Sequence, residues 1–309
     1  MNRWKVFLRF ALLVICFVAR AEVTYTGTTS ADAFLATGSS NNPVGTDLTG
    51  LNFGAAGTLV VAPASSVKGE FQSVIRFNLS NAVALFNTTY GTNGWRIAGI
   101  SLELTSNYGV GGVQPNNPIF NVISGGSFVI EWLSNDNWME GTGTPNLPTS
   151  DGVTYDSLPD LLSGNHEILC TNSYLPPGNN VHVTYPLPLK TNLVVDAGNG
   201  GDVSLRFYAA DNQINYLFNS YSYGRGNEPF IHLTAAPSLR IVSGYFTNNV
   251  FRLKGIGGES VQYQVQANVD LTPTNWQTIG TVTADSTGAI QFDDTTANNH
   301  ARQFYRLAQ

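Results

Sequence analysis

The chain has 309 residues, of which 42% are hydrophobic and 12% are charged, well below the ~25% charged residues of an average protein. Acidic residues outnumber basic ones by 21 to 15, so the formal net charge at pH 7 is −6. Nucleic acids and anionic membranes both select a basic surface, and we therefore predict neither as a partner.

Residues 1–21 have the pattern of a secretory signal peptide. Arg3, Lys5 and Arg9 precede the apolar run "FALLVICFVA", and "ARA" then stands before Glu22. That run is too short to span a bilayer, which takes about 20 residues, and no later stretch is long and apolar enough to do so. We expect a secreted or cell-surface protein that begins near Glu22, with 11 basic and 21 acidic residues and no transmembrane segment. Cys170 is then the one remaining cysteine, which excludes an internal disulfide.

The apolar residues between 22 and 236 form short runs separated by Gly, Asn and Pro, which is typical of an all-β fold. Strands are expected at 57–62, 73–79, 97–106, 127–133, 201–210, 214–222 and 229–235. Short helices are expected at 80–86 and 157–164, each with a serine at its start. Residues 141–185 are rich in glycine, proline and asparagine, which predicts a functional loop or a cover for a sheet edge.

Pro237 marks a domain boundary, so that residues 22–236 form one domain and residues 238–309 a second. In "VQYQVQANVD" the residues Tyr263, Val265 and Ala267 share one face of a strand and the glutamines share the other. The runs "NWQTIGTVTAD", "STGAIQFDD" and "RQFYRLAQ" supply further strands. This pattern predicts a small sandwich of the immunoglobulin or fibronectin kind.

Six motifs carry a resemblance to a known family across residues 23–236. They are, in order, "ADAFLATGS", "NFGAAGTLVV", "VIRFNLS", "ISLELTS", "WMEGTGTPN" and "DVSLRFYAA…NSYSYGRGNEPFIHLTA". This series resembles the disaggregatase-related repeat domain known by the consensus letters DNRLRE, which is similar to carbohydrate-binding modules. The resemblance implies a jelly-roll-type β-sandwich of a secreted bacterial protein. It departs from the family at "SYSYGRGNEP", where members often show Ser-Arg-Glu.

The second domain also has a resemblance. "YQVQANVDLTPTNWQTIG" and "FYRLAQ" are similar to a repeat found at the C-termini of secreted proteins from polysaccharide-degrading bacteria. This implies a sorting or adhesion module rather than a catalyst.

The stretch "NDNWMEGTGTPNLP" has two interpretations. Trp138 and Glu140 share one face of an extended chain, and an aromatic ring beside a carboxylate is a common sugar-binding arrangement. Alternatively, Trp138 fills the core at a strand end and Glu140 accepts backbone N–H groups of the glycine turn. We favour the structural interpretation and keep both residues as candidate sugar contacts.

The run "INYLFNSYSYGRGN" is the richest aromatic patch of the sequence. Tyr216, Tyr221, Tyr223 and Arg225 are candidate carbohydrate-binding residues, because rings stack on pyranose faces and a guanidinium pairs with an acidic sugar. The same tyrosines could instead cover a sheet edge. Trp95, in "GTNGWRIAG", is interpreted as a plug at the start of a strand.

A structural calcium ion is a further hypothesis. "DAGNGGD" places Asp196, Asn199 and Asp202 in a glycine-rich turn, and "TSADAF" offers Asp32. Calcium takes six to eight such oxygen ligands, although turn chemistry alone also explains this composition. We predict no other cofactor.

Three functions are compatible with these features. The first is a secreted or surface-attached protein that binds a polysaccharide or a cell-surface glycan without catalysis. The second is a polysaccharide lyase or hydrolase with its site in residues 135–185, although the sequence contains no serine-nucleophile elbow and no zinc-protease motif. The third is a structural or adhesion component of the cell surface.

Overall fold

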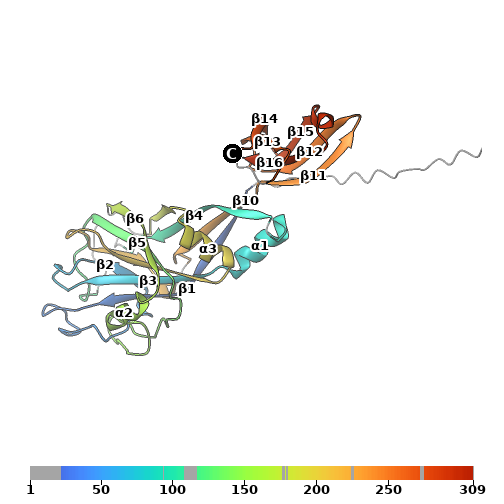
Figure 1. The fold of residues 1–309 in the computed structure, drawn as a ribbon. Helices are drawn as coiled ribbons and strands as arrows, with labels where there is room; N and C mark the ends of the chain where they lie inside the picture. Colours follow the sequence, from blue (N-terminus) through green and yellow to red (C-terminus); the bar gives the residue numbers. More distant parts are fainter. Residues whose placement is uncertain are drawn as a thin grey trace, which may run out of the picture. The chain divides into compact units, whose positions relative to one another are not determined.

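A computed structural model describes residues 22–92, 94–107, 117–175, 178, 180–223, 226–271 and 275–308. The predicted signal peptide and Arg225 lie outside these described residues. The described chain forms two compact units, one from Glu22 to Ala236 and one that begins at Pro237 (Figure 1).

The first unit contains ten strands and three α-helices within its described residues. The strands are β1 (Val23–Ala36), β2 (Thr58–Val61), β3 (Phe71–Asn78), β4 (Trp95–Thr105), β5 (Gly126–Leu133), β6 (His166–Tyr174), β7 (His182–Leu187), β8 (Asp202–Ala209), β9 (Tyr216–Asn219) and β10 (Phe230–Pro237). The helices are α1 (Ser80–Tyr90), α2 (Leu158–Leu161) and α3 (Thr191–Asn199), with the short 3-10 helices η2 (Tyr155–Ser157) and η3 (Tyr221–Tyr223).

Strand β1 joins the two halves of the main sheet, whose order is β6-β5-β8-β3-β1-β10-β4-β7. The first part of β1 pairs with β10 up to Thr28, and the second part pairs with β3 from Thr29 onward, both antiparallel. The register shifts between Thr29 and Ala31. Such a bulge bends a strand and increases its twist, so β1 passes from one half of the sheet to the other. Beyond Thr28, one edge of β1 is therefore free of β10.

The two halves pack against each other as the layers of a sandwich. Alternate residues of each strand point into one large buried cluster, as the 2.0 period of a strand requires. The cluster includes Ile100, Leu102 and Leu104 of β4, Ile231 and Leu233 of β10, Phe128, Ile130 and Trp132 of β5, and Val203, Leu205 and Phe207 of β8. The separate pair β2–β9 adds Leu59, Val61, Tyr216 and Phe218 to it.

Helices α1 and α3 also join this core. Ala82 and Phe86 of α1 and Leu193 and Ala197 of α3 are fully buried in the large cluster. Figure 1 shows both helices beside β4. Gly200 follows α3 in the left-handed conformation (φ 73°), which is the usual end of a helix.

The second unit consists of two three-stranded sheets, β11-β12-β15 and β14-β13-β16. Their bounds are β11 (Arg240–Thr247), β12 (Val250–Ile256), β13 (Gln262–Asn268), β14 (Gln277–Thr283), β15 (Ala289–Asp294) and β16 (Phe304–Ala308), with the 3-10 helix η4 (Ala297–Asn299). Tyr263, Val265 and Ala267 are buried and the intervening glutamines are not, which agrees with the alternation in the sequence.

The all-β prediction is confirmed, and two local expectations are wrong. Residues 141–185 are not a continuous loop, because 166–174 form β6 on the edge of the sheet beside β5. The stretch "DAGNGGD" is not a single turn, because Asp196 and Asn199 belong to α3 and Asp202 begins β8. The apolar residues of α3, Leu193 and Ala197, are four apart and dock on the core, and this burial outweighs the turn propensity of Asn and Gly.

Candidate functional site

Trp138 is a buried structural residue. Its side chain is 7% exposed and packs in a second apolar cluster with Ala31, Val74 and Leu133. The indole Nε1–H donates to Ser204 Oγ on β8 at 3.0 Å. The burial of this ring favours the core interpretation of Trp138, and its small exposed part lines an open pocket of about 400 Å³ together with Asn137, Met139 and Asp160.

Arg76 of β3 fixes the backbone on either side of this tryptophan. Its Nη1 donates to the carbonyl oxygens of Asp136 (2.7 Å) and Trp138 (2.8 Å), and its guanidinium carbon lies 5.0 Å from the indole centroid. Burial raises the pKa of Asp136 to about 6, while the Ser204 hydroxyl and the Arg76 charge oppose that rise. The guanidinium thus serves the fold of the 135–143 segment.

Asn52 explains why glycines follow Trp138. Its fully buried Nδ2 donates to the carbonyl oxygens of Glu140 (2.6 Å) and Val153 (2.8 Å), and its Oδ1 accepts from the N–H groups of Gly54 (3.0 Å) and Gly143 (3.1 Å). A Cβ atom on Gly143 would collide with the Asn52 carbonyl oxygen. The glycine run is therefore required by close backbone packing around one amide.

Glu140 lies beside Asp32. From the sequence, Asp32 is one of the candidate calcium ligands and Glu140 is one of the candidate sugar contacts. Asp32 is fully buried, and its Oδ2 accepts the backbone N–H of Tyr221 at 2.6 Å. Burial raises the pKa of Asp32 to about 7, and the charge of Glu140 adds to that rise. Burial also raises the pKa of Glu140, while the backbone N–H of Asp32 opposes it. The structure thus brings together Asp32, Glu140 and Tyr221, three residues from three separate predictions.

The remaining aromatic candidates differ in how exposed their side chains are. Tyr216 is fully buried and stacks on Tyr174 with a centroid distance of 3.4 Å, so it is not available as a surface contact. Tyr221 is 51% exposed, and Tyr223 is partly exposed, both within η3. The predicted Tyr–Arg pair cannot be described, since Arg225 lies outside the described residues.

The four predicted calcium ligands do not form one site. Asp196 Oδ2 accepts the indole N–H of Trp132 at 2.7 Å, and Asp202 Oδ1 accepts from Asn78 Nδ2 at 2.8 Å. Asn199 is exposed at the end of α3. No set of three or more His, Cys, Asp or Glu side chains that could hold a metal ion occurs in the part of the chain that the structure describes.

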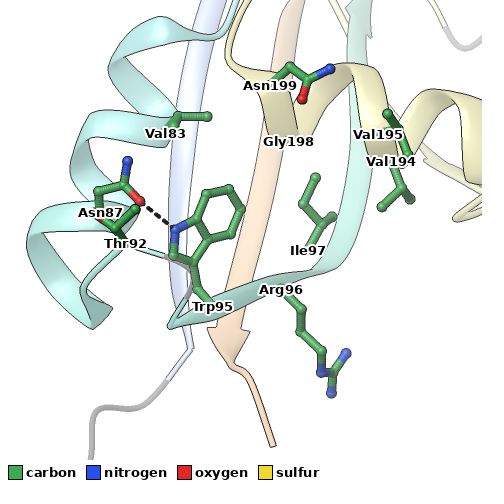
Figure 2. Close-up of a pocket in the computed structure, with 10 residues that line it drawn as sticks. All are labelled: Val83, Asn87, Thr92, Trp95, Arg96, Ile97, Val194, Val195, Gly198 and Asn199. Carbon is green, nitrogen blue, oxygen red and sulfur yellow. Dashed lines mark hydrogen bonds between the residues drawn. The ribbon is translucent and has the colours of Figure 1, made fainter.

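An open pocket of about 460 Å³ lies between α1, α3 and the start of β4 (Figure 2). It is lined by Val83, Asn87, Thr92, Trp95, Arg96, Ile97, Val194, Val195, Gly198 and Asn199. Figure 2 shows the Trp95 ring between the side chains of α1 and Ile97, with Arg96 directed away from it. The lining of the pocket is mostly apolar, and its polar groups are the amides of Asn87 and Asn199, the hydroxyl of Thr92 and the guanidinium of Arg96.

Trp95 is held in this pocket by α1. Its Nε1–H donates to Asn87 Oδ1 at 2.9 Å, and its ring lies 5.0 Å from that of Phe86. Trp95 begins β4 and packs against the large core cluster, as the sequence predicted, and the exposed part of its indole also lines the pocket. The sequence held one signal for this pocket: the adjacent Val194 and Val195 of α3 cannot both face the core, and Val195 is exposed.

His166, the histidine within the segment 135–185 suggested for a catalytic site, is part of a network with Glu131 and Arg206. His166 Nδ1 lies 2.9 Å from Glu131 Oε1, and Arg206 Nη1 donates to Glu131 Oε2 at 2.8 Å. Glu131 is buried, and this trio lies across β5, β6 and β8. These contacts form a hydrogen-bonded network around the buried Glu131 carboxyl, with His166 at the surface, and an arrangement with a nucleophile is not seen among the described residues around it.

No protein-family model matches the chain, and no curated protein is significantly similar to it. Two solved structures are similar at a low level. They are a β-glucuronidase from Ruminococcus gnavus in complex with uronic isofagomine (8% identity, TM-score 0.24, 89% of this chain and 39% of that chain) and a β-1,2-glucanase from Parabacteroides distasonis (9% identity, TM-score 0.18, 94% and 37%). The chain thus spans well under half the length of either protein, and likeness at these TM-scores carries no argument. In the described residues no helix has the length and apolarity needed to cross a membrane.

Proposed function

We propose that this chain is a secreted or cell-surface protein that binds a polysaccharide or cell-surface glycan without catalysis, through the pocket at Trp95. The observation that carries the proposal is the partly exposed indole between α1 and α3, inside a pocket whose polar groups are two amides, a hydroxyl and the guanidinium of Arg96. The resemblance of residues 23–236 to a family similar to carbohydrate-binding modules supports the same function.

The chemistry of the pocket suits a sugar. The indole and the valines offer an apolar surface for the C–H face of a pyranose, and Asn87, Thr92 and Asn199 offer donors and acceptors to its hydroxyls. The volume of about 460 Å³ falls within the range of roughly 300–1,000 Å³ that is usual for small-molecule sites. Glycoside hydrolysis usually requires a pair of carboxylates, and no carboxylate lines this pocket.

Affinity gel electrophoresis with neutral and acidic polysaccharides, followed by calorimetry on the best ligand, tests the proposal. Trp95→Ala is expected to weaken binding about tenfold or more, since it removes the stacking surface. Asn199→Ala, on an exposed side chain, is expected to weaken binding less and to leave the melting temperature unchanged.

Tyr221→Ala is the matched control, because Tyr221 belongs to the separate aromatic patch at η3 (Tyr221–Tyr223). It is expected to bind like the wild type. Loss of binding in Tyr221→Ala but not in Trp95→Ala would place the ligand on η3 and contradict the proposed pocket. Release of sugar fragments by the purified protein would contradict the non-catalytic role.

A structural or adhesive role is the second candidate, and one observation favours it. In the second unit, β11 exposes Ile241, Tyr245 and Phe246, the last at 59%. β11 is an edge strand of its sheet, and an exposed edge with apolar side chains can pair with another chain. Absence of binding to every polysaccharide, together with self-association that Phe246→Ser abolishes, would favour this role over glycan binding.

A further inference from the structure

Unpaired polar atoms gather where β1 passes the segment after Trp138 and the end of β9. Asp32 Oδ1, Glu140 Oε1, Ser220 Oγ and both amide atoms of Asn219 are buried and have no hydrogen-bond partner within the described part of the chain. Asp32, Asn219 and Ser220 are themselves fully buried. Native proteins leave only a few such atoms unpaired per 100 residues, so five at one place require an explanation.

Several observations place these side chains together. The backbone N–H of Tyr221 bonds to Asp32 Oδ2, which brings the adjacent Ser220 to the carboxyl group. The Ser220 hydroxyl lowers the pKa of Asp32 through a loosely aligned hydrogen bond, and the charge of Glu140 raises it, so both groups lie against this carboxyl. Neither Ser220 Oγ nor Asp32 Oδ1 has a hydrogen bond of standard geometry with a described residue.

Asn219 is fully buried and directly precedes Ser220 at the end of β9. Phe34 and Leu217 belong to one buried cluster, and Asp32 and Asn219 each lie two residues from them. Residues two apart on a strand share a face, so the carboxyl of Asp32 and the amide of Asn219 lie on the face that this cluster occupies. Asn219 of β9 pairs with Thr58 of β2. Strand β2 is in turn linked to β3 by the hydrogen bond from the Val60 N–H to Ser73 Oγ.

The charge of the cluster needs compensation. Asp32 is a fully buried carboxyl group and Glu140 is half-buried, and an unpaired charge in such surroundings is strongly unfavourable. The nearest described cation, Arg76, acts on Glu140, but its guanidinium donates to two backbone carbonyls. The atoms at this site that can coordinate a cation are oxygens, and they belong to two carboxylates, a hydroxyl and an amide carbonyl.

We propose that Asp32, Glu140, Ser220 and the side-chain carbonyl of Asn219 bind one calcium ion that links β1, the 135–143 segment and the end of β9. Two carboxylates neutralise a divalent cation. Oxygen ligands without sulfur or imidazole suit calcium rather than zinc, and calcium accepts the irregular geometry that magnesium rejects. This site is independent of the proposed glycan pocket and shares with the earlier calcium hypothesis only Asp32.

The experiment uses the purified full chain, with metal content measured by inductively coupled plasma mass spectrometry. We expect about one calcium ion per chain. Removal by chelator is expected to lower the melting temperature by about 5 °C or more, because a ligand that binds only the folded state stabilises it. Calcium chloride is expected to restore the melting temperature, and magnesium or sodium chloride at the same ionic strength is not.

Three variants locate the site. Asp32→Asn is expected to abolish the calcium-dependent shift in melting temperature, whereas Asp196→Asn, a matched carboxylate of α3, is expected to keep it. Should Asp32→Asn not fold, Ser220→Ala replaces one neutral ligand and is expected to raise the calcium concentration for half-restoration about tenfold.

Two outcomes would overturn the proposal. One is loss of the calcium effect in Asp196→Asn and not in Asp32→Asn, which would move the ion to α3. The other is a protein that contains no bound metal, whose melting temperature does not change when chelator is added, and whose Asp32→Asn variant is as stable as the wild type. In that case Asp32 is simply protonated inside the fold.

Discussion

Trp138 and Trp95 stand in similar local sequences, "DNWMEGTG" and "TNGWRIAG", but the fold uses them differently. Trp138 is enclosed, with Arg76 of β3 over its ring and Ser204 of β8 on its N–H. Trp95 bonds to Asn87 of the nearby helix α1 and keeps part of its ring in an open pocket. The comparison shows that tertiary neighbours, rather than the flanking residues, decide whether a tryptophan beside glycine fills the core or lines a pocket.

Trp138→Ala should have the largest effect on stability. It removes a buried indole, leaves a cavity beside Val74 and Leu133, and deprives Ser204 Oγ of its donor. Replacement of a buried aromatic by alanine costs about 3–5 kcal/mol. Urea denaturation should show this loss in the free energy of unfolding. A loss below about 1 kcal/mol would mean that Trp138 is not the core residue described above.

Asn52→Ala should be the next most damaging change. It leaves the carbonyl oxygens of Glu140 and Val153 and the N–H groups of Gly54 and Gly143 without their buried partner. Each unsatisfied buried group costs about 1–3 kcal/mol, and water that enters the cavity recovers part of it, so we expect a loss of about 2–4 kcal/mol. Asn146→Ala, in an exposed part of the same loop region, is the control and should change the unfolding free energy by less than about 0.5 kcal/mol.

The sequence predicts those parts of the molecule that depend on local pattern. Alternating apolar residues predicted many of the strands, and a helix begins at Ser80 as expected, but its N-cap is Leu79 and no side chain caps it. Strands β1, β6, β11 and β12 and helix α3 were missed, because their mixed composition is compensated by contacts with distant segments. The Asp32–Glu140 pair was missed for the same reason: the two residues are far apart in sequence, and only the register of β1 brings them together.

Trp95→Ala should have a moderate effect on stability. The ring is partly exposed, so its removal should cost about 1–2 kcal/mol, less than half of the cost at Trp138. Parallel urea titrations of both variants measure this contrast directly. Equal losses at the two positions would indicate that the pocket at Trp95 is closed in solution, and would weaken the case for a ligand there.

Asp136→Asn should have the smallest effect and the opposite sign. Burial raises the pKa of Asp136 from 3.8 to about 6, so between these values the folded chain binds more protons than the unfolded chain. The contribution of this group to stability therefore falls as the pH rises from about 4 to about 6, and stays low above that. Asparagine carries no charge, so the variant should gain stability relative to the wild type between pH 4 and pH 7.5, by at most about 1 kcal/mol because the carboxyl is partly exposed.

Thermal melts of the wild type and of Asp136→Asn at these two pH values measure the difference. A variant that loses stability at pH 7.5 would show that the ionised carboxylate is paired more strongly than its contacts with Ser204 and Arg76 indicate, and that the segment beside Trp138 is held by charge as well as by packing.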